Sequence, residues 1–373
     1  MKILILSADF PTWDGGVAVW AEKSALHLQH LGHEVTVVTP RQRDLADDQF
    51  DLSCPYGVIR LKNVKDRYKK YFKYRYDLWK LLRREQFDLF LSASSWFPFA
   101  NAVMHLAPQT PLYTIVHGND FLEKRWFSFF WKPRMQRAFT HSKGIIAVSE
   151  ETRRRFLEIF SECEKKTCVI PPGVDTEDFS GKSTFPPAEN PILLTVGRIV
   201  ERKGHDRVLQ ALPLVMKEFP HLRYIIAGRG SYLQTLERMT RELHLEKNVQ
   251  FEGFISQERK SELLHQCTAY IMPSRTIDVS GDLEGYGITY LEANACGRPV
   301  IGSNEGGPAE AIQDRITGLQ ANPHSIEDIA EKILTLLRDP AYAQRLGQQG
   351  LEWVQAKANW AARIQKLNDF FPR

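Results

Sequence analysis

The chain has 373 residues, which at roughly 150 residues per domain corresponds to two or three domains. Its hydrophobic content of 43% and charged content of 25% are those of an ordinary globular protein, which excludes disordered, collagenous and coiled-coil classes. The net charge of +4 is too small to indicate nucleic-acid binding, but residues 1–170 carry 26 basic and 19 acidic side chains and residues 171–373 carry 23 and 26. The basic surplus of the first part favours contact with an anionic surface.

The cysteines and the apolar runs indicate where the protein works. The five cysteines are odd in number and none has the spacing of a metal site, so we expect free thiols in a reducing compartment. The opening segment MKILILSADFP is too short for a signal peptide, and no run reaches the roughly 18 apolar residues of a membrane-spanning helix. We therefore expect a cytoplasmic protein, peripheral at most to the inner face of the cell membrane.

The first part of the chain alternates between buried strands and amphipathic helices. KILILS (2–7) and EVTVVT (34–39) read as strands, and apolar residues from Val17 to Leu31 recur between them at helical spacing, with Gly32 as the end of the helix. This β-α-β pattern predicts a parallel sheet with right-handed crossovers. Further strands are predicted at 87–93, 111–118, 144–149 and 166–174.

A polar, Ser- and Pro-rich segment interrupts the alternation at 175–190 and then the pattern restarts. The later strands are expected in PILLTVGR, RYIIAGRG, VQFEGF, AYIMPS and PVIGS, with helices near 204–218, 231–243, 256–266, 287–296 and 308–313. We predict a first domain over 1–175, a linker over 176–190, a second domain over 191–354 and a C-terminal helix, about 355–373, that packs back on the first domain. The fold class is α/β, with two doubly wound Rossmann-like domains facing across a cleft and ligands beyond the carboxyl ends of the strands.

The segment EGYGITYLEANACGRPVIGS (284–303) carries the strongest chemical signal. Glu284 precedes a predicted helix, Gly285 and Gly287 allow backbone amides to approach a ligand at its N-terminus, and Glu292 follows about a turn and a half into it. Free N–H groups and the helix dipole attract phosphate at such a position. Two glutamates at this spacing would occur by chance, so the prediction depends on the whole string.

Together with IMPSR (271–275), this string resembles the signature of retaining glycosyltransferases of the GT-B fold, in the large family 4 of group 1 glycosyl transferases. Residues 274–293 look most like the phosphatidylinositol mannosyltransferases. The resemblance implies a hexosyltransferase that moves a sugar from a nucleotide-sugar donor to an acceptor held by the first domain. It implies no cofactor, and the absence of an Asp-x-Asp motif at a strand end suits a site without metal.

Other motifs fall in the family's order. TVGRIVERKGHD (195–206) is similar to its phosphate clamp, which implies that Arg198 and Lys203 grip the donor diphosphate. The alternative is a pair of solvated cations, but positive charge at a helix start is unfavourable, which favours the functional role. WDGGVAVW (13–20) matches the loop that closes over the donor phosphates through Gly15 and Gly16; the alternative is a simple βα turn.

The remaining candidates rest more heavily on the resemblance. HGND (117–120) resembles the active-site histidine segment, so His117 is expected to contact the transferred sugar, with Asp120 as a weaker candidate; a histidine there is more often a structural hydrogen-bonding residue. AGRGS (227–231) suggests a phosphate loop at Gly228, and VQFEGFIS (249–256) suggests a base site at Phe254 and Ile255 or else a plain buried strand. The implied catalytic residues are His117, Glu284, Arg198 and Lys203, and the implied donor contacts add Gly285, Tyr286, Gly287, Ile288 and Glu292.

Two stretches combine basic and aromatic residues. Residues 62–84 hold ten Lys/Arg and two Asp among Tyr68, Tyr71, Phe72, Tyr74, Tyr76 and Trp79. This composition suits an anionic membrane surface, and the alternative is aromatic residues packed on the sheet with the cations pointing outward. Residues 123–137 are expected in the core. Nucleic acid is not an expected partner.

The donor and the reaction class remain open in the sequence. GDP-mannose is favoured as the donor and a UDP-sugar comes next, with a lipid-linked or polysaccharide acceptor. The alternatives are a sugar-nucleotide epimerase or hydrolase of the same fold, and a soluble glycosyltransferase acting on a small acceptor. A dinucleotide oxidoreductase is disfavoured because no G-x-G-x-x-G motif follows the first strand.

Overall fold

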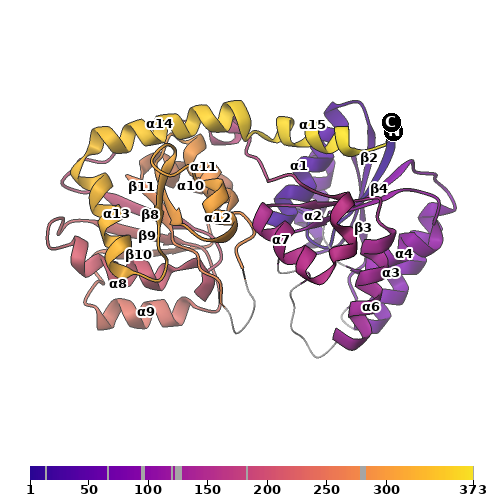
Figure 1. The fold of residues 1–373 in the computed structure, drawn as a ribbon, viewed down its shortest axis with the longest axis horizontal. Helices are drawn as coiled ribbons and strands as arrows, with labels where there is room; N and C mark the ends of the chain where they lie inside the picture. The colour runs from indigo at the N-terminus through magenta and orange to yellow at the C-terminus, as the bar shows by residue number, and fades with distance from the viewer. Residues whose placement is uncertain are drawn as a thin grey trace. The chain divides into compact units, whose positions relative to one another are not determined.

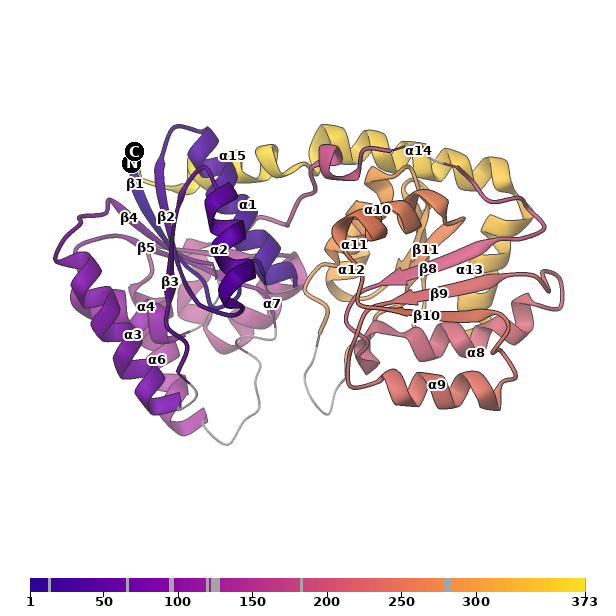
Figure 2. The ribbon, with the colours of Figure 1, turned by 180° about the vertical axis from the view of Figure 1, so that it is seen from behind.

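The structure is a computed structural model that describes residues 1–12, 15–64, 67–93, 97–118, 121, 128–181, 184–277 and 283–372. The chain divides into two compact units: unit 1 comprises Met1–Pro172 and Trp360–Arg373, and unit 2 comprises Gly173–Asn359. Each unit is a parallel sheet with helices on both faces (Figures 1 and 2). The predicted class of two doubly wound Rossmann-like domains is confirmed.

The sheet of unit 1 has seven strands in the order β3-β2-β1-β4-β5-β6-β7. They are β1 (Lys2–Leu6), β2 (Glu34–Pro40), β3 (Gly57–Leu61), β4 (Leu89–Ser92), β5 (Leu112–Val116), β6 (Gly144–Ala147) and β7 (Thr167–Val169). β1 lies at the point where the strand order reverses, with Ile3 opposite both Val35 of β2 and Leu89 of β4. Residues 3–6 are fully buried, as the unbroken apolar run of this strand predicts.

Helices cover both faces of this sheet. They are α1 (Gly16–His30), α2 (Asp44–Ser53), α3 (Arg67–Leu82), α4 (Phe97–Leu106), α6 (Ser128–His141), α7 (Glu150–Ile159) and α15 (Trp360–Phe370), with a 3₁₀ helix η1 (Ser161–Lys166). Figure 1 shows α3, α4 and α6 side by side, while α15 packs against α1. The first helix ends as predicted, because Gly32 just beyond it takes the left-handed φ of 85°.

The sheet of unit 2 has six strands in the order β10-β9-β8-β11-β12-β13. They are β8 (Ile192–Val196), β9 (Arg223–Ala227), β10 (Val249–Gly253), β11 (Ala269–Met272), β12 (Val300–Ser303) and β13 (Gly318–Ala321). Successive side chains of β8 lie on opposite faces of the sheet, with Leu193 in one core cluster and Leu194 in the other. Both faces of the sheet are therefore covered, which explains the solidly apolar strands.

The helices of unit 2 form one layer on each face. They are α8 (His205–Val215), α9 (Leu233–Glu242), α10 (Gln257–Gln266), α11 (Ile288–Ala295), α12 (Gly306–Ala311), α13 (Ile326–Arg338) and α14 (Pro340–Lys357), with 3₁₀ helices η2 (Thr176–Phe179) and η3 (Glu201–Lys203). α8 packs against α9 and α13, and α11 packs against α12 and α14, as Figure 2 shows. Each of the five helices predicted near 204–313 is present.

The segment predicted as a linker packs on unit 2. Phe179 is 4% exposed, and its carbonyl accepts a hydrogen bond from Nε2 of His265 at 2.8 Å. The amide of Thr184 donates to the carbonyl of His265 at 3.1 Å. One buried aromatic side chain therefore anchors a polar segment, and the units divide at Pro172–Gly173 instead of within 176–190.

At the C-terminal end of the chain the units divide again between Asn359 and Trp360, so that α15 belongs to unit 1. Trp360 is 1% exposed and meets the ring of Trp20 edge-on, with the ring centroids 6.0 Å apart.

All five cysteines are free thiols. Within the described part of the chain, no helix is both long and apolar enough to cross a membrane.

Candidate functional site

The site begins at the carboxyl ends of β8 and β11, the neighbouring strands at which the strand order of unit 2 reverses. β8 leads through Gly197 and η3 into α8, and β11 leads through Pro273 toward Glu284 and α11. Ligands of doubly wound sheets bind in the crevice that such a reversal creates. The two segments that the sequence singled out for chemistry, 195–206 and 284–303, both follow these strands.

The loops at this edge approach one another more closely than side chains allow. A Cβ at Gly204, whose φ is 76°, would lie 2.1 Å from the carbonyl oxygen of Pro273. A Cβ at Gly228, whose φ is 146°, would lie 1.8 Å from the carbonyl oxygen of Gly197. Glycine is required at both positions, since no real Cβ contact is that short and a side chain would also strain the backbone. The glycines therefore fix the spacing of the loops after β8, β9 and β11.

Glu284 lies between two cations. Its carboxylate accepts a hydrogen bond from Arg202, and Nζ of Lys203 lies 2.8 Å from Oε2. Only 13% of the Glu284 side chain is exposed. Burial alone would raise the pKa of Glu284, but the positive charges of Arg202 and Lys203 outweigh it and lower the pKa to about 2. The predicted residues Glu284 and Lys203 are thus in direct contact, and the carboxylate is charged at neutral pH.

The glycine-rich segment after Glu284 forms the start of α11. Gly287 is the residue before the first helical turn and has the left-handed φ of 92°, and Ile288 is the first residue of the helix. Tyr286 is 4% exposed and belongs to the core. The first N–H groups of a helix have no partner within it. The segment thus ends in amides that suit an anionic ligand, next to the cations that bind Glu284.

Glu292 forms a separate ion pair within α11. Its Oε1 lies 2.7 Å from Nζ of Lys260 on α10, and the residue is 7% exposed. Its Oε2 is buried and has no hydrogen-bond partner among the residues that the structure describes. A buried acceptor of this kind is normally satisfied. Oε2 of Glu292 can therefore accept a hydrogen bond from a ligand hydroxyl. The contact of Glu292 with the nucleotide sugar remains a prediction.

Three more predicted donor contacts lie at this edge of the sheet. Arg198 is exposed directly after Gly197, and Ile255 is partly buried against the core. Phe254 is 47% exposed, with the guanidinium of Arg229 5.5 Å from its ring centroid. The alternative of a plain buried strand does not fit Phe254. Its role at a nucleotide base is not tested by these contacts and stays a prediction.

In unit 1 the predicted residues lie beyond the carboxyl ends of its strands. Gly15 precedes α1 and Gly16 begins it, and both are exposed. His117 follows β5, and its Nε2 lies 2.8 Å from the carbonyl oxygen of Ala93, so that nitrogen carries the proton and donates. The ring of Trp20 meets His117 edge-on at 6.4 Å. His117 therefore has the structural hydrogen bond of the alternative interpretation, and a sugar contact remains a prediction.

Some predicted residues lie outside the described part of the chain. These are Asp120, residues 13 and 14 of the glycine-rich motif, and residues 123–127 of the second basic-aromatic stretch, while the side chains of 128–132 are likewise not described. No group of three or more His, Cys, Asp or Glu side chains within the described ranges is arranged to hold a metal ion.

Three charged residues of the site are not predicted from the sequence. Arg202 adjoins Lys203 in η3 and Arg275 ends the IMPSR motif, but neither position alone indicates a function. Arg275 is 6% exposed and bonds both oxygens of Asp206 at 2.9 Å. Lys260 had no distinguishing signal, because it lies in a helix rich in charged residues.

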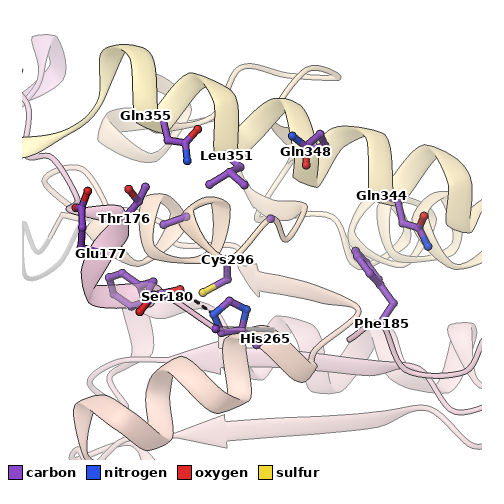
Figure 3. A pocket seen from close by; sticks show the side chains of 14 residues that line it. Thr176, Glu177, Ser180, Phe185, His265, Cys296, Gln344, Gln348, Leu351 and Gln355 are labelled. Atoms are coloured by element: carbon purple, nitrogen blue, oxygen red, sulfur yellow. Dashed lines mark hydrogen bonds between the residues drawn. The ribbon is translucent and has the colours of Figure 1, made fainter. Parts of the chain in front are cut away.

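Unit 2 also contains a cavity of about 780 Å³ that none of the predicted site residues lines. Figure 3 shows it between η2, the ends of α10 and α11, and α14. Its described lining is mostly amide, hydroxyl and apolar, namely Thr176, Glu177, Phe179, Ser180, Gly181, Phe185, His265, Ala295, Cys296, Gly297, Gln344, Gln348, Leu351 and Gln355. No Lys or Arg is among these residues, so the cations at Lys203 are the better match for a phosphate group.

Two family models match adjoining parts of the chain. Residues 14–178 match Glycosyltransferase Family 4, and residues 176–353 match Glycosyl transferases group 1. Together the two matches span nearly the whole chain and meet close to the division between the units. The chain thus carries a Glycosyltransferase Family 4 domain followed by a Glycosyl transferases group 1 domain, as the motifs predicted.

Two relatives that match the chain over nearly its full length are mannosyltransferases. The chain is 28% identical, over 99% of its length and 97% of the relative, to the GDP-mannose-dependent alpha-(1-6)-phosphatidylinositol monomannoside mannosyltransferase of Mycobacterium tuberculosis. The same enzyme of Mycolicibacterium smegmatis is also 28% identical, over 98% of the chain and 97% of the relative. Among solved structures, Anabaena HepE in complex with UDP-glucose has a TM-score of 0.79 at 20% identity, covering 99% of this chain and 98% of that one. WaaG of lipopolysaccharide biosynthesis has a TM-score of 0.71 at 17% identity, covering 100% of both chains. These structures share the fold.

Proposed function

We propose that the protein is a retaining glycosyltransferase that moves mannose from GDP-mannose to a lipid-linked or polysaccharide acceptor at a membrane surface. The observation that carries this proposal is Glu284 held by Arg202 and Lys203 at the strand reversal of unit 2. The full-length similarity to GDP-mannose-dependent mannosyltransferases supports the choice of donor. A UDP-sugar is the next candidate.

The hard step in such a transfer is the departure of the nucleoside diphosphate from the anomeric carbon. Negative charge grows on the leaving phosphate while an oxocarbenium-like centre forms at the sugar. Arg198, Lys203 and the amides at the start of α11 supply fixed positive charge and donors to stabilise that phosphate, which is commonly the largest catalytic contribution. Glu284 orients the sugar through its hydroxyls. The acceptor hydroxyl bonds to the anomeric carbon on the face from which the diphosphate leaves and passes its proton to the departing phosphate oxygen, so the configuration is retained. No step of this scheme needs a metal ion.

The residues of unit 1 are assigned to the sugar and the acceptor. Gly15 and Gly16 present backbone amides at the start of α1. His117 follows β5, and its Nε2 donates to the carbonyl oxygen of Ala93, which fixes the position of the ring. His117 is proposed as a sugar contact, because it lies in the segment HGND that resembles the family's active-site histidine segment, and not as the general base.

We assign contact with the membrane surface to α3, because two faces of this helix differ in exposure. Tyr74 and Leu78 are each 1% exposed and belong to the core of unit 1. Phe72, Tyr76 and Trp79 are 67%, 51% and 39% exposed. These three positions are spaced by four and three residues, so they share one side of the helix. Packing in the core of unit 1 thus accounts for one face of α3, and the aromatic residues of another face are exposed to solvent.

Cations flank that aromatic face. Tyr76 and Trp79 are stacked with centroids 5.8 Å apart, Nζ of Lys80 lies 4.4 Å from the Tyr76 centroid, and the Arg83 guanidinium lies 5.0 Å from the Trp79 centroid. Aromatic rings with adjacent cations suit the boundary between anionic headgroups and acyl chains, where each Lys or Arg contributes about 1 kcal/mol. We therefore assign α3 as a peripheral docking helix at the inner face of the cell membrane.

Sedimentation with vesicles tests this assignment. Wild-type protein is expected to sediment with vesicles containing phosphatidylglycerol at low salt, and the Phe72→Ser/Trp79→Ser variant is expected to stay in solution. Leu45→Ser, at an exposed leucine of α2, is the matched control and should behave as wild type. Equal sedimentation of the aromatic variant, or no binding by wild type, would remove α3 from the account.

Donor turnover tests the proposed reaction. The protein is incubated with GDP-mannose, UDP-glucose or ADP-glucose, with and without lipid extract, and nucleoside diphosphate release is followed. With GDP-mannose we expect the wild-type protein to release GDP only when lipid extract is present. We expect the Lys203→Ala variant to release no GDP. Acceptor-independent conversion of a donor would instead indicate the epimerase or hydrolase class.

A further inference from the structure

We use the name clamp for Lys203 together with its neighbours Arg202 and Glu284. Next to the clamp, Arg275 and Asp206 form a second, buried ion pair. Nη1 and Nη2 of Arg275 donate to Oδ1 and Oδ2 of Asp206, each at 2.9 Å, and both residues are 6% exposed. This side-by-side geometry uses the fork of the guanidinium, which a lysine cannot reproduce. The partners are 69 positions apart in the sequence.

The pair joins the two segments that bear the candidate site. Arg275 is the third residue after β11, on the segment that leads to Glu284, whereas Asp206 is the third residue after Lys203. The backbone adds to the connection, because the amide of Arg275 donates to the carbonyl of Arg202 at 2.8 Å. Arg275 also reaches Glu201 at 3.3 Å. Both residues before Lys203 in η3 are therefore tied to Arg275.

The Arg275–Asp206 pair adjoins other buried residues. His205, between Lys203 and Asp206, is 1% exposed, and burial together with the charges of Lys203 and Arg275 lowers its pKa to about 3. The imidazole is thus neutral and adds no positive charge to the cluster. Arg275 has both terminal nitrogens on Asp206 and little exposed surface, so it is suited to hold the clamp in place and not to bind a ligand itself.

We propose that Arg275 and Asp206 are positioning residues whose ion pair holds Lys203 opposite Glu284 and so sets the affinity of unit 2 for a nucleoside diphosphate. This inference rests on the proposed function, because it takes the clamp as the diphosphate site. Arg275→Lys keeps the charge but loses the second parallel hydrogen bond, so the segment after β11 is no longer held in register with η3. Displacements of about 1 Å at such sites reduce activity by about a hundredfold.

Calorimetric titration with GDP and UDP provides the test, using wild type, Arg275→Lys, Asp206→Asn and the double variant. We expect each single variant to bind GDP about tenfold to a hundredfold more weakly, and the double variant to bind no more weakly than the singles, because the same interaction is lost in all three. Arg338→Lys is the matched control: Arg338 makes a two-pronged bond to Glu218 on an exposed surface of the same unit, and its loss should leave GDP affinity unchanged.

The outcomes separate the inference from the proposed function. A purely structural role predicts a lower melting temperature and a smaller bound fraction, with the dissociation constant of the folded protein unchanged, and this result would overturn the inference. Additive losses in the double variant would also contradict it. If wild-type protein bound neither GDP nor UDP, the proposed donor site itself would be refuted.

Discussion

Replacing Glu284 by Gln tests the electrostatics of the site without a change of shape. The substitution removes a buried negative charge that Arg202 and Lys203 both contact. Their attraction lowers the pKa of Glu284 from 4.5 to about 2, which corresponds to about 3 kcal/mol of stabilisation at about 1.4 kcal/mol per pH unit. Removing one member of a buried ion pair commonly costs about 3–5 kcal/mol, because the other charge remains buried. We therefore expect Glu284→Gln to lower the free energy of unfolding by about 3 kcal/mol at pH 7.

The difference in free energy of unfolding between wild type and Glu284→Gln depends on pH, and the direction of the pKa shift decides how. Because the pKa of Glu284 is lower in the folded state, its contribution is fully present above pH 4.5 and disappears as the pH falls toward 2. The difference between wild type and Glu284→Gln should thus shrink to roughly half between pH 7 and pH 3. Urea unfolding at both pH values measures it, with Glu218→Gln, in an exposed ion pair, as the control. A difference that is absent at pH 7, or that grows on acidification, would refute the reasoning.

Three further substitutions test the packing that supports the site. Trp20→Ala removes a fully buried ring beside His117 and Trp360, so urea unfolding should show a loss of about 3–5 kcal/mol; an unchanged midpoint would contradict this packing. Phe179→Ala should destabilise unit 2 by a similar amount, about 3–5 kcal/mol, whereas a true linker would tolerate the change without effect. Gly228→Ala places a Cβ 1.8 Å from the Gly197 carbonyl oxygen, so we expect a lower melting temperature and weaker GDP binding in titration; retention of both would show that these loops can separate.

The central parts of the fold were predictable because each depends on local pattern. β1, β8 and β11 are apolar apart from Lys2 and Thr195 and are buried on both faces, and the helices of unit 2 follow from their own periodicity. The edge strands β3 and β13 were not predicted, since polar residues, Arg60 in β3 and Gln320 in β13, interrupt their apolar pattern. An edge strand needs less apolar character, so its pattern is weaker.

The site was predicted to the extent that its residues adjoin recognisable motifs. Glu284 and Lys203 lie in such motifs, and the structure brings them into contact. The Arg275–Asp206 and Lys260–Glu292 pairs were not predictable, because each joins residues from different elements and only the fold decides which charges meet. The two faces of α3 likewise required knowledge of which residues the core of unit 1 buries.

The most direct measurement of the central claim is mannosyl transfer from radiolabelled GDP-mannose into extracted lipid, compared between wild type and Lys203→Ala. Lys217→Ala, on the same unit but outside the site, serves as the control. We predict labelled lipid with wild type and with Lys217→Ala, and none with Lys203→Ala although the variant remains folded. Transfer by Lys203→Ala at the wild-type rate, or a folded wild-type protein that transfers no sugar from GDP-mannose to any lipid or polysaccharide fraction, would contradict the account.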